Sequence, residues 1–204
     1  MRSSLYIKGM TLVELLIALS IFVTVIVVVG AFEVNVFSYQ GTVSGSLTTV
    51  QDAQVILKTM LTELRSAAPG ANGAYPIITA GTSSISFFCD PDNDGQTEQI
   101  TYSLIKNTLY RAIIQPSGTP AVYNPATQAT SSLLTDVRNT SSTPVFQYYD
   151  QNYTGTSSPL AIPANIPSIR LIQINLTLDT DPNRSPLPRT YTTQVSLRNL
   201  KTNL

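Results

Sequence analysis

Residues 12–32 constrain this chain more than any other segment, because nearly all of their side chains are apolar. Glu14 is the only ionisable residue among them, and Ser20 and Thr24 are the only residues with a hydroxyl group. At 1.5 Å per residue, a helix over residues 10–32 is about 35 Å long, enough to cross a hydrocarbon layer of roughly 30 Å. The segment therefore predicts one membrane-spanning helix.

The residues on either side of this run predict its orientation. Residues 1–9 contain Arg2 and Lys8 and no acidic residue, so the positive-inside rule keeps this end in the cytoplasm and sends the rest outward. A cleaved secretory signal would end in small residues at a cleavage site. Residues 30–34, Gly-Ala-Phe-Glu-Val, instead continue a helical pattern, which favours a retained anchor.

Glu14 needs an explanation, because a carboxylate at the start of a membrane helix is costly without a positively charged partner. The boundary between the polar leader and the apolar run falls at Gly9. Hydrolysis after Gly9 would free an α-amino group on Met10, about one helical turn before Glu14. That amine could pair with Glu14 of the same chain or of a neighbouring subunit.

Residues 8–16, Lys-Gly-Met-Thr-Leu-Val-Glu-Leu-Leu, resemble the cleavage and methylation motif of type IV prepilins and type II secretion pseudopilins. The resemblance covers residues 2–32, and Met10 stands where phenylalanine is more common in the family. It implies cleavage between Gly9 and Met10 by a membrane prepilin peptidase, followed by N-methylation of Met10. It also implies that Glu14 acts in filament assembly.

The same resemblance implies the partners and the location of the chain. The expected partners are other pilin or pseudopilin subunits, contacted through the N-terminal helix, the prepilin peptidase, and an assembly platform in the inner membrane. The precursor is expected to be a single-pass inner-membrane protein, and the mature form part of an extracytoplasmic filament. No nucleic-acid partner is expected outside a competence pilus, because 12 basic and 12 acidic side chains leave no net positive charge.

A second helical pattern follows the apolar run. Gly41 and Gly45 predict a bend or interruption, because each glycine lowers helix propensity by about 1 kcal/mol. Pro69 and Gly70 predict the end of the helix near Ala68. Gln51, Asp52, Lys58 and Glu63 fall off the apolar stripe, which is expected to pack on a sheet of the same chain. The alternative is a coiled-coil dimer through the same stripe. That stripe consists of Val50, Ala53, Leu57, Met60, Leu64 and Ala67.

The rest of the chain has the alternating pattern of β-strands separated by loops rich in Ser, Thr and Pro. The expected fold class is α+β, with a long N-terminal helix packed on an antiparallel sheet. The expected divisions are a leader (1–9), a membrane or filament-core helix (10–32), an amphipathic helix (33–68) and a β-sheet head (69–204). Long loops are expected over 115–144 and 152–167. Strands are expected at 84–89, 99–105, 108–114, 145–149, 169–178 and 190–197.

The predicted strand-turn-strand over 90–111 and the ending at 195–199 resemble minor pilins and pseudopilins of the W and J type. This implies a subunit that assembles into, initiates or caps a pilus-like or secretion filament. The alternative is a membrane-anchored extracytoplasmic adhesin or ligand-binding protein. An enzyme is not expected, because the chain has no histidine and no evident pairing of acid, base and nucleophile. Cys89, the single cysteine, follows two phenylalanines and is expected to be buried and inert.

Residues 90–95, Asp-Pro-Asp-Asn-Asp-Gly, place carboxylates at the alternating spacing of a calcium loop. Asp90, Asp92, Asp94 and Glu98 are the candidate ligands, and calcium is the candidate cofactor. The match to an EF-hand is incomplete, because its twelfth position is Thr101 and the flanking segments predict strands. The alternative is a simple Asp/Asn/Gly turn between two strands.

A cluster of aromatic and acidic residues precedes the second long loop. Tyr148, Tyr149, Asp150 and Tyr153 could form a patch that binds a sugar or a surface, because aromatic faces with polar tips suit such contacts. The alternative is that these residues anchor the loop that follows them.

Overall fold

The computed structural model describes residues 11–179 and 187–197; over residues 34–49 it describes the helical backbone alone. Residues 1–47 and 48–204 form two compact units, which are treated separately below. The predicted leader, residues 1–9, lies outside the described residues, and so does Met10.

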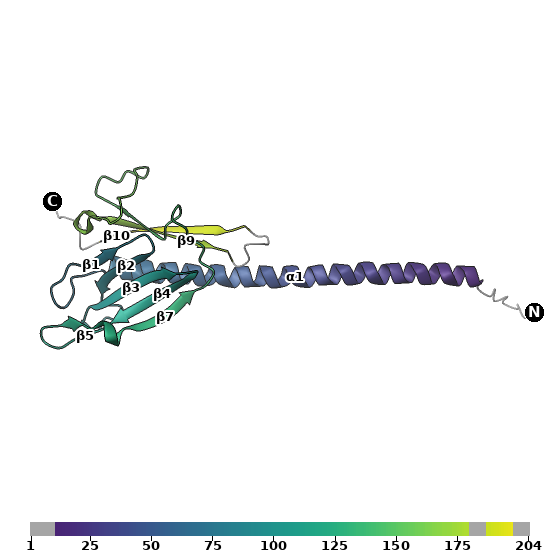
Figure 1. Ribbon diagram of the computed structural model, residues 1–204, viewed down its shortest axis with the longest axis horizontal. Coiled ribbons are helices and arrows are strands. Elements are labelled where there is room, and N and C mark those ends of the chain that lie inside the picture. The colour runs from purple at the N-terminus through teal and green to yellow at the C-terminus, as the bar shows by residue number, and fades with distance from the viewer. Residues whose placement is uncertain (1–10, 180–186, 198–204) are drawn as a thin grey trace, which may run out of the picture. The chain divides into compact units, whose positions relative to one another are not determined.

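One helix, α1, runs from Leu12 to Arg65 over 54 residues (Figure 1). The interruption predicted at Gly41 and Gly45 is therefore wrong, because the helical backbone continues through both positions. A glycine weakens a helix but keeps its N–H and C=O groups, so the hydrogen-bond ladder survives it. The helix ends four residues before Pro69, which disfavours helical geometry at the residue before it.

The N-terminal part of α1 is apolar and uncovered. The segment Leu12–Glu33 has a mean hydropathy of 3.0. Its apolar residues are not buried against any other part of the described protein. Phe22 and Phe32, for example, are 61% and 68% exposed. By length and composition this is one helix able to cross a membrane, as an anchor or as a signal sequence.

The second unit combines the last turns of α1 with antiparallel sheets, which confirms the predicted α+β class. A five-stranded sheet has the order β1-β2-β3-β4-β7, a three-stranded sheet the order β10-β9-β8, and β5 and β6 form a small hairpin (Figure 1). The strands are β1 (Ile77–Ala80), β2 (Ser84–Cys89), β3 (Glu98–Ile105), β4 (Thr108–Ile114), β5 (Pro116–Ser117), β6 (Val122–Tyr123), β7 (Ala129–Leu134), β8 (Phe146–Tyr149), β9 (Leu171–Leu178) and β10 (Arg189–Ser196).

All six predicted strands are present, but the predicted loop over 115–144 is partly wrong. It contains β5, β6, the short 3-10 helix Pro125–Thr127 and β7. Strand β7, Ala-Thr-Ser-Ser-Leu-Leu, has four exposed residues in a row and no alternation of apolar residues. It is a strand because its backbone pairs with β4 at the sheet edge, which composition does not reveal. The predicted loop over 152–167 holds only the start of a second 3-10 helix, Ile166–Ser168.

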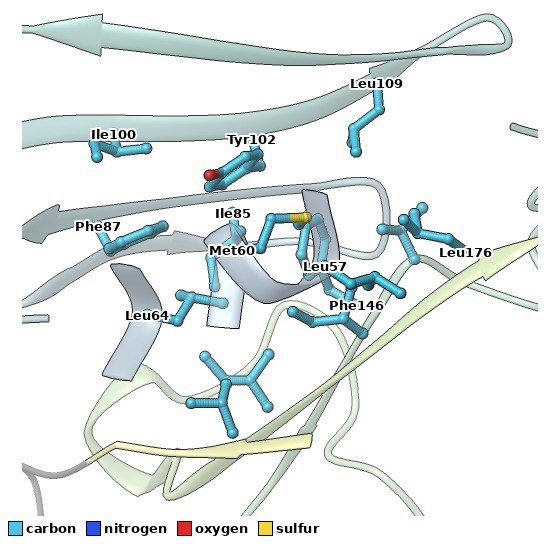
Figure 2. Packing of buried hydrophobic residues seen from close by; sticks show 14 of the residues in the cluster. Leu57, Met60, Leu64, Ile85, Phe87, Ile100, Tyr102, Leu109, Phe146 and Leu176 are labelled. Atoms are coloured by element: carbon cyan, nitrogen blue, oxygen red, sulfur yellow. The ribbon is translucent and has the colours of Figure 1, made fainter. Parts of the chain in front are cut away.

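The predicted apolar stripe on α1 forms the centre of the head's core. Met60 and Leu64 are fully buried, and Figure 2 shows them between side chains of the two larger sheets. Tyr102 and Phe87 come from the five-stranded sheet, and Phe146 comes from the three-stranded sheet. The head therefore has a single apolar core that the helix shares with both sheets.

Glu63 lies off the predicted apolar stripe of α1 but is nevertheless buried. It is 6% exposed and carries a buried polar cluster with Tyr102 and Arg111, which pair directly across β3 and β4. Arg111 Nη2 donates to Glu63 Oε1 at 2.6 Å, and Arg111 Nε donates to Oε2 at 3.3 Å. The Tyr102 hydroxyl donates to Oε2 at 2.5 Å. The cluster joins the helix to the sheet with three charge-assisted hydrogen bonds.

The environment keeps Tyr102 in its donor form. Burial raises the pKa of the Tyr102 phenol far above its ordinary value, and the negative charge of Glu63 acts in the same direction. The phenol therefore stays protonated and donates to the carboxylate over the whole physiological pH range.

We predict that Arg111→Met lowers the free energy of unfolding by about 3 kcal/mol, because it leaves the buried Glu63 carboxylate without its cation. The triple variant Glu63→Leu, Tyr102→Phe, Arg111→Met removes every polar atom of the cluster and should recover most of that loss. Urea unfolding of the full chain in mild detergent, followed by near-ultraviolet circular dichroism of the tyrosines, measures both. Equal stabilities of wild type and Arg111→Met would contradict the proposed role of the cluster.

Candidate functional site

The predicted processing site is only partly within the described residues. Gly9 and Met10 lie outside them, so cleavage between these residues and methylation of Met10 remain predictions. Thr11 precedes α1 by one residue, and Glu14 lies in the first turn of the helix.

Thr11 and Glu14 form a reciprocal cap at the start of α1. The backbone N–H of Thr11 donates to Glu14 Oε2 at 2.9 Å, and the backbone N–H of Glu14 donates to Thr11 Oγ1 at 3.3 Å. The Thr11 hydroxyl also contacts Glu14 Oε2 at 3.0 Å. This is a capping box, which satisfies backbone donors that a helix start otherwise leaves free.

The capping box gives Glu14 a local role that the sequence interpretation missed. The pattern Thr-x-x-Glu immediately before an apolar run is its sequence signal. The cap engages Oε2, and within 11–179 and 187–197 nothing donates to Oε1 and no cationic side chain pairs with this carboxylate. Glu14 therefore caps the start of the helix through Oε2. Its negative charge has no positively charged partner among these residues.

The second predicted site is the loop between β2 and β3. Asp90, Asp92 and Glu98 come together there, with one carboxylate oxygen of each residue within 4.8 Å of the others. Asp94 does not join them, because its carboxylate accepts hydrogen bonds from the backbone and side chain of Gln96 at 2.8 and 3.4 Å. Three of the four candidate ligands therefore lie together, and cation binding by any of them stays a prediction.

The loop is also a tight turn between strands, as its composition predicted. Asn93 and Gly95 have φ values of 58° and 88°, the left-handed region that favours these two residue types. The Asp90 carboxylate accepts from the backbone N–H groups of Asp94 at 3.1 Å and Gly95 at 2.9 Å. A turn and a cation site are compatible here, because these bonds fix the direction of the Asp90 side chain.

Glu98 differs from the aspartates in being buried. It is 2% exposed, and its Oε2 atom has no hydrogen-bond partner. Burial raises the pKa of the Glu98 carboxyl, and the charges of Asp92, Asp94 and Asp90 raise it further. The chain thus places a desolvated carboxylate near the half-buried Asp90 and the exposed Asp92. This arrangement is unfavourable unless a cation or a proton compensates the charge.

The aromatic cluster before the second long loop anchors that loop. Tyr148 is fully buried and donates to the Gly81 carbonyl at 2.8 Å. The rings of Tyr149 and Tyr153 lie 4.1 Å apart between centroids, and Asp150 accepts from the backbone N–H of Asn152 at 2.9 Å. These contacts support the anchoring alternative over a sugar-binding patch.

A hollow of about 460 Å³ lies elsewhere on the head. Tyr75, Ile77, Phe88, Val122 and Tyr123 are among its lining residues, so its walls are mainly apolar and aromatic. The lining includes no acidic or basic side chain. Sequence reasoning did not predict it, because the lining residues come from separate segments that only the fold brings together.

Cys89 is buried, as predicted. Burial raises the pKa of the Cys89 thiol to about 12, and the carboxylate of Glu63 acts in the same direction. The thiolate is the nucleophilic form, so Cys89 is unreactive at neutral pH.

No model of a known protein family matches the chain, and no curated protein matches it in sequence. The structure by itself defines an α+β protein with one long N-terminal apolar helix followed by antiparallel sheets. This architecture is consistent with a pilin-like fold and does not assign the chain to a family.

We predict that iodoacetamide labels Cys89 at pH 8 at least about a hundredfold more slowly in the folded chain than in urea, where the thiol pKa is about 8.5. Mass spectrometry measures the single adduct directly, because the chain has one cysteine. Similar labelling rates with and without urea would contradict the burial of this thiol.

Proposed function

We propose that the chain is a minor pilin or pseudopilin subunit, which assembles into a pilus-like or secretion filament after cleavage between Gly9 and Met10. The observation that carries the proposal is the uncovered apolar helix with one carboxylate in its first turn. That carboxylate, Glu14, lies four residues after Met10 of the Gly9–Met10 pair.

The uncovered apolar surface supports assembly through the helix. Side chains around the whole circumference are exposed, including Leu15, Ile17, Val23 and Ile26 at 52–57%. Such a helix is stable in lipid, and outside lipid it needs other apolar helices around it. Burial against neighbours in a filament core would contribute about 25 cal/mol for each Å² of apolar surface removed from water.

The uncompensated charge of Glu14 supports a specific register between subunits. Cleavage after Gly9 would place a positive α-amino group on Met10, close to the helix start. In a filament core of low polarity, that amine and the Glu14 carboxylate of a neighbouring subunit would attract each other strongly. The pair would fix the axial position of one helix against the next.

The head supports a terminal or low-abundance position. Beside the two sheets that pack on α1, it has a separate hairpin and long irregular segments outside the shared core. We propose that the subunit initiates or caps the fibre, with the prepilin peptidase and the inner-membrane platform as its processing and assembly partners. The head would then lie on the outer side of the inner membrane.

Glu14→Gln is the sharpest test, because glutamine can keep the capping box and removes only the charge. We predict that this variant inserts into the membrane as wild type does but fails to enter sheared filaments. The matched control is Glu33→Gln, at the other end of the same apolar segment, which should enter filaments normally. Quantitative immunoblots of membrane and filament fractions measure both.

Normal incorporation of Glu14→Gln would contradict the charge pairing and leave the capping box as the function of this residue. Absence of the wild-type chain from every filament fraction would contradict the filament subunit altogether. That result would favour the alternative function, a membrane-anchored extracytoplasmic adhesin or ligand-binding protein.

A further inference from the structure

Three carboxylates converge at the loop between β2 and β3 without a cation beside them. In the part of the chain that the structure describes, no lysine or arginine nitrogen lies within 4.0 Å of Asp90, Asp92 or Glu98. We propose that these three residues bind one divalent cation, and that the ion is calcium. The inference goes beyond the proposed filament function and does not depend on it.

The buried Glu98 side chain is the first step of the argument. A carboxylate oxygen removed from water without a hydrogen-bond partner is strongly unfavourable, and Glu98 Oε2 is in that position. A carboxylate oxygen of the same residue lies within 4.8 Å of oxygens of both Asp90 and Asp92. A cation between the three would neutralise the desolvated charge and remove the repulsion between them.

The spacing of the oxygens is the second step. Calcium binds oxygen at about 2.4 Å, so two ligands on opposite sides of the ion are separated by roughly 4.8 Å. The three carboxylate oxygens lie within that limit of one another. Magnesium demands near-ideal octahedral geometry and gives up its water reluctantly, whereas calcium accepts irregular sets of protein oxygens. An irregular set of three carboxylates on a loop between two strands therefore fits calcium better.

The loop is held in place from both sides, which is the third step. Glu98 pairs with Cys89 at the last position of the β2–β3 ladder, so its backbone is fixed by the sheet. The Tyr123 hydroxyl donates to the Thr97 carbonyl at 2.5 Å and accepts from the backbone N–H of Ala71 at 2.9 Å. The Asp90 carboxylate is oriented by the two backbone donors described above. These contacts reduce the ordering needed for an ion to bind.

The site differs from an EF-hand in its construction. Its loop joins two strands, and its buried carboxylate is the ninth residue counted from Asp90. Glu98 thus supplies the deeply placed ligand from the first residue of β3. Asp94 contributes negative charge nearby while its own oxygens bond to Gln96.

The competing account is a protonated Glu98 with no ion, and calorimetry separates the two. Titration of calcium into the full chain, in mild detergent and after treatment with a chelator, should give saturable one-site binding. Glu98→Gln and the exposed-ligand variant Asp92→Asn should each weaken the calcium affinity at least about tenfold. Asp52→Asn, which removes an exposed carboxylate from α1, should bind as wild type does.

Asp92→Asn keeps the test interpretable even if Glu98→Gln disturbs folding, because Asp92 is exposed. Circular dichroism of each variant confirms the fold before titration. Absence of saturable binding at millimolar calcium would overturn the site. Equal affinities of wild type and Asp92→Asn would also overturn it.

Discussion

The need to cover apolar surface on one helix governs the rest of this protein. Along α1 the residues from Ala53 to Leu64 that form the apolar stripe are buried by the head's own sheets. The residues from Leu12 to Glu33 have no such cover within the chain. The C-terminal stripe of the helix therefore buries its apolar surface when the head folds. The N-terminal segment must bury its apolar surface against lipid or against other helices.

The contact between α1 and the sheets of the head is apolar except for one buried polar cluster. Glu63 meets Tyr102 and Arg111 at a point where the helix crosses β3 and β4. Such a cluster contributes little net stability compared with apolar residues of the same size, but it is very unfavourable when incomplete. It can therefore specify how the helix packs on the sheet. The carboxylates of Glu63, Glu14 and Glu98 each lie where an uncompensated negative charge is unfavourable. Arg111 compensates Glu63 within the head, and the proposals above give Glu14 the Met10 amine and Glu98 a calcium ion.

Periodicity made the helix stripe and the six main strands predictable, because side chains three or four residues apart on a helix, or two apart on a strand, share a face. Periodicity did not predict the burial of Glu63, because a charged residue beside an apolar stripe usually faces solvent. Its burial depends on Arg111 and Tyr102, which only the fold places opposite it. Strand β7 was missed because edge pairing, and not composition, defines it. The acidic loop was found from spacing alone, whereas the burial of Glu98 required the fold.

Cleavage between Gly9 and Met10 is the central event of the proposed assembly, and an intact-mass measurement tests it. The chain is recovered from the membranes and sheared filaments of cells that produce it, and its mass is compared with that of the full sequence. The filament account predicts a chain that begins at Met10 and carries one added methyl group. A mature chain that still retains residues 1–9 would contradict it.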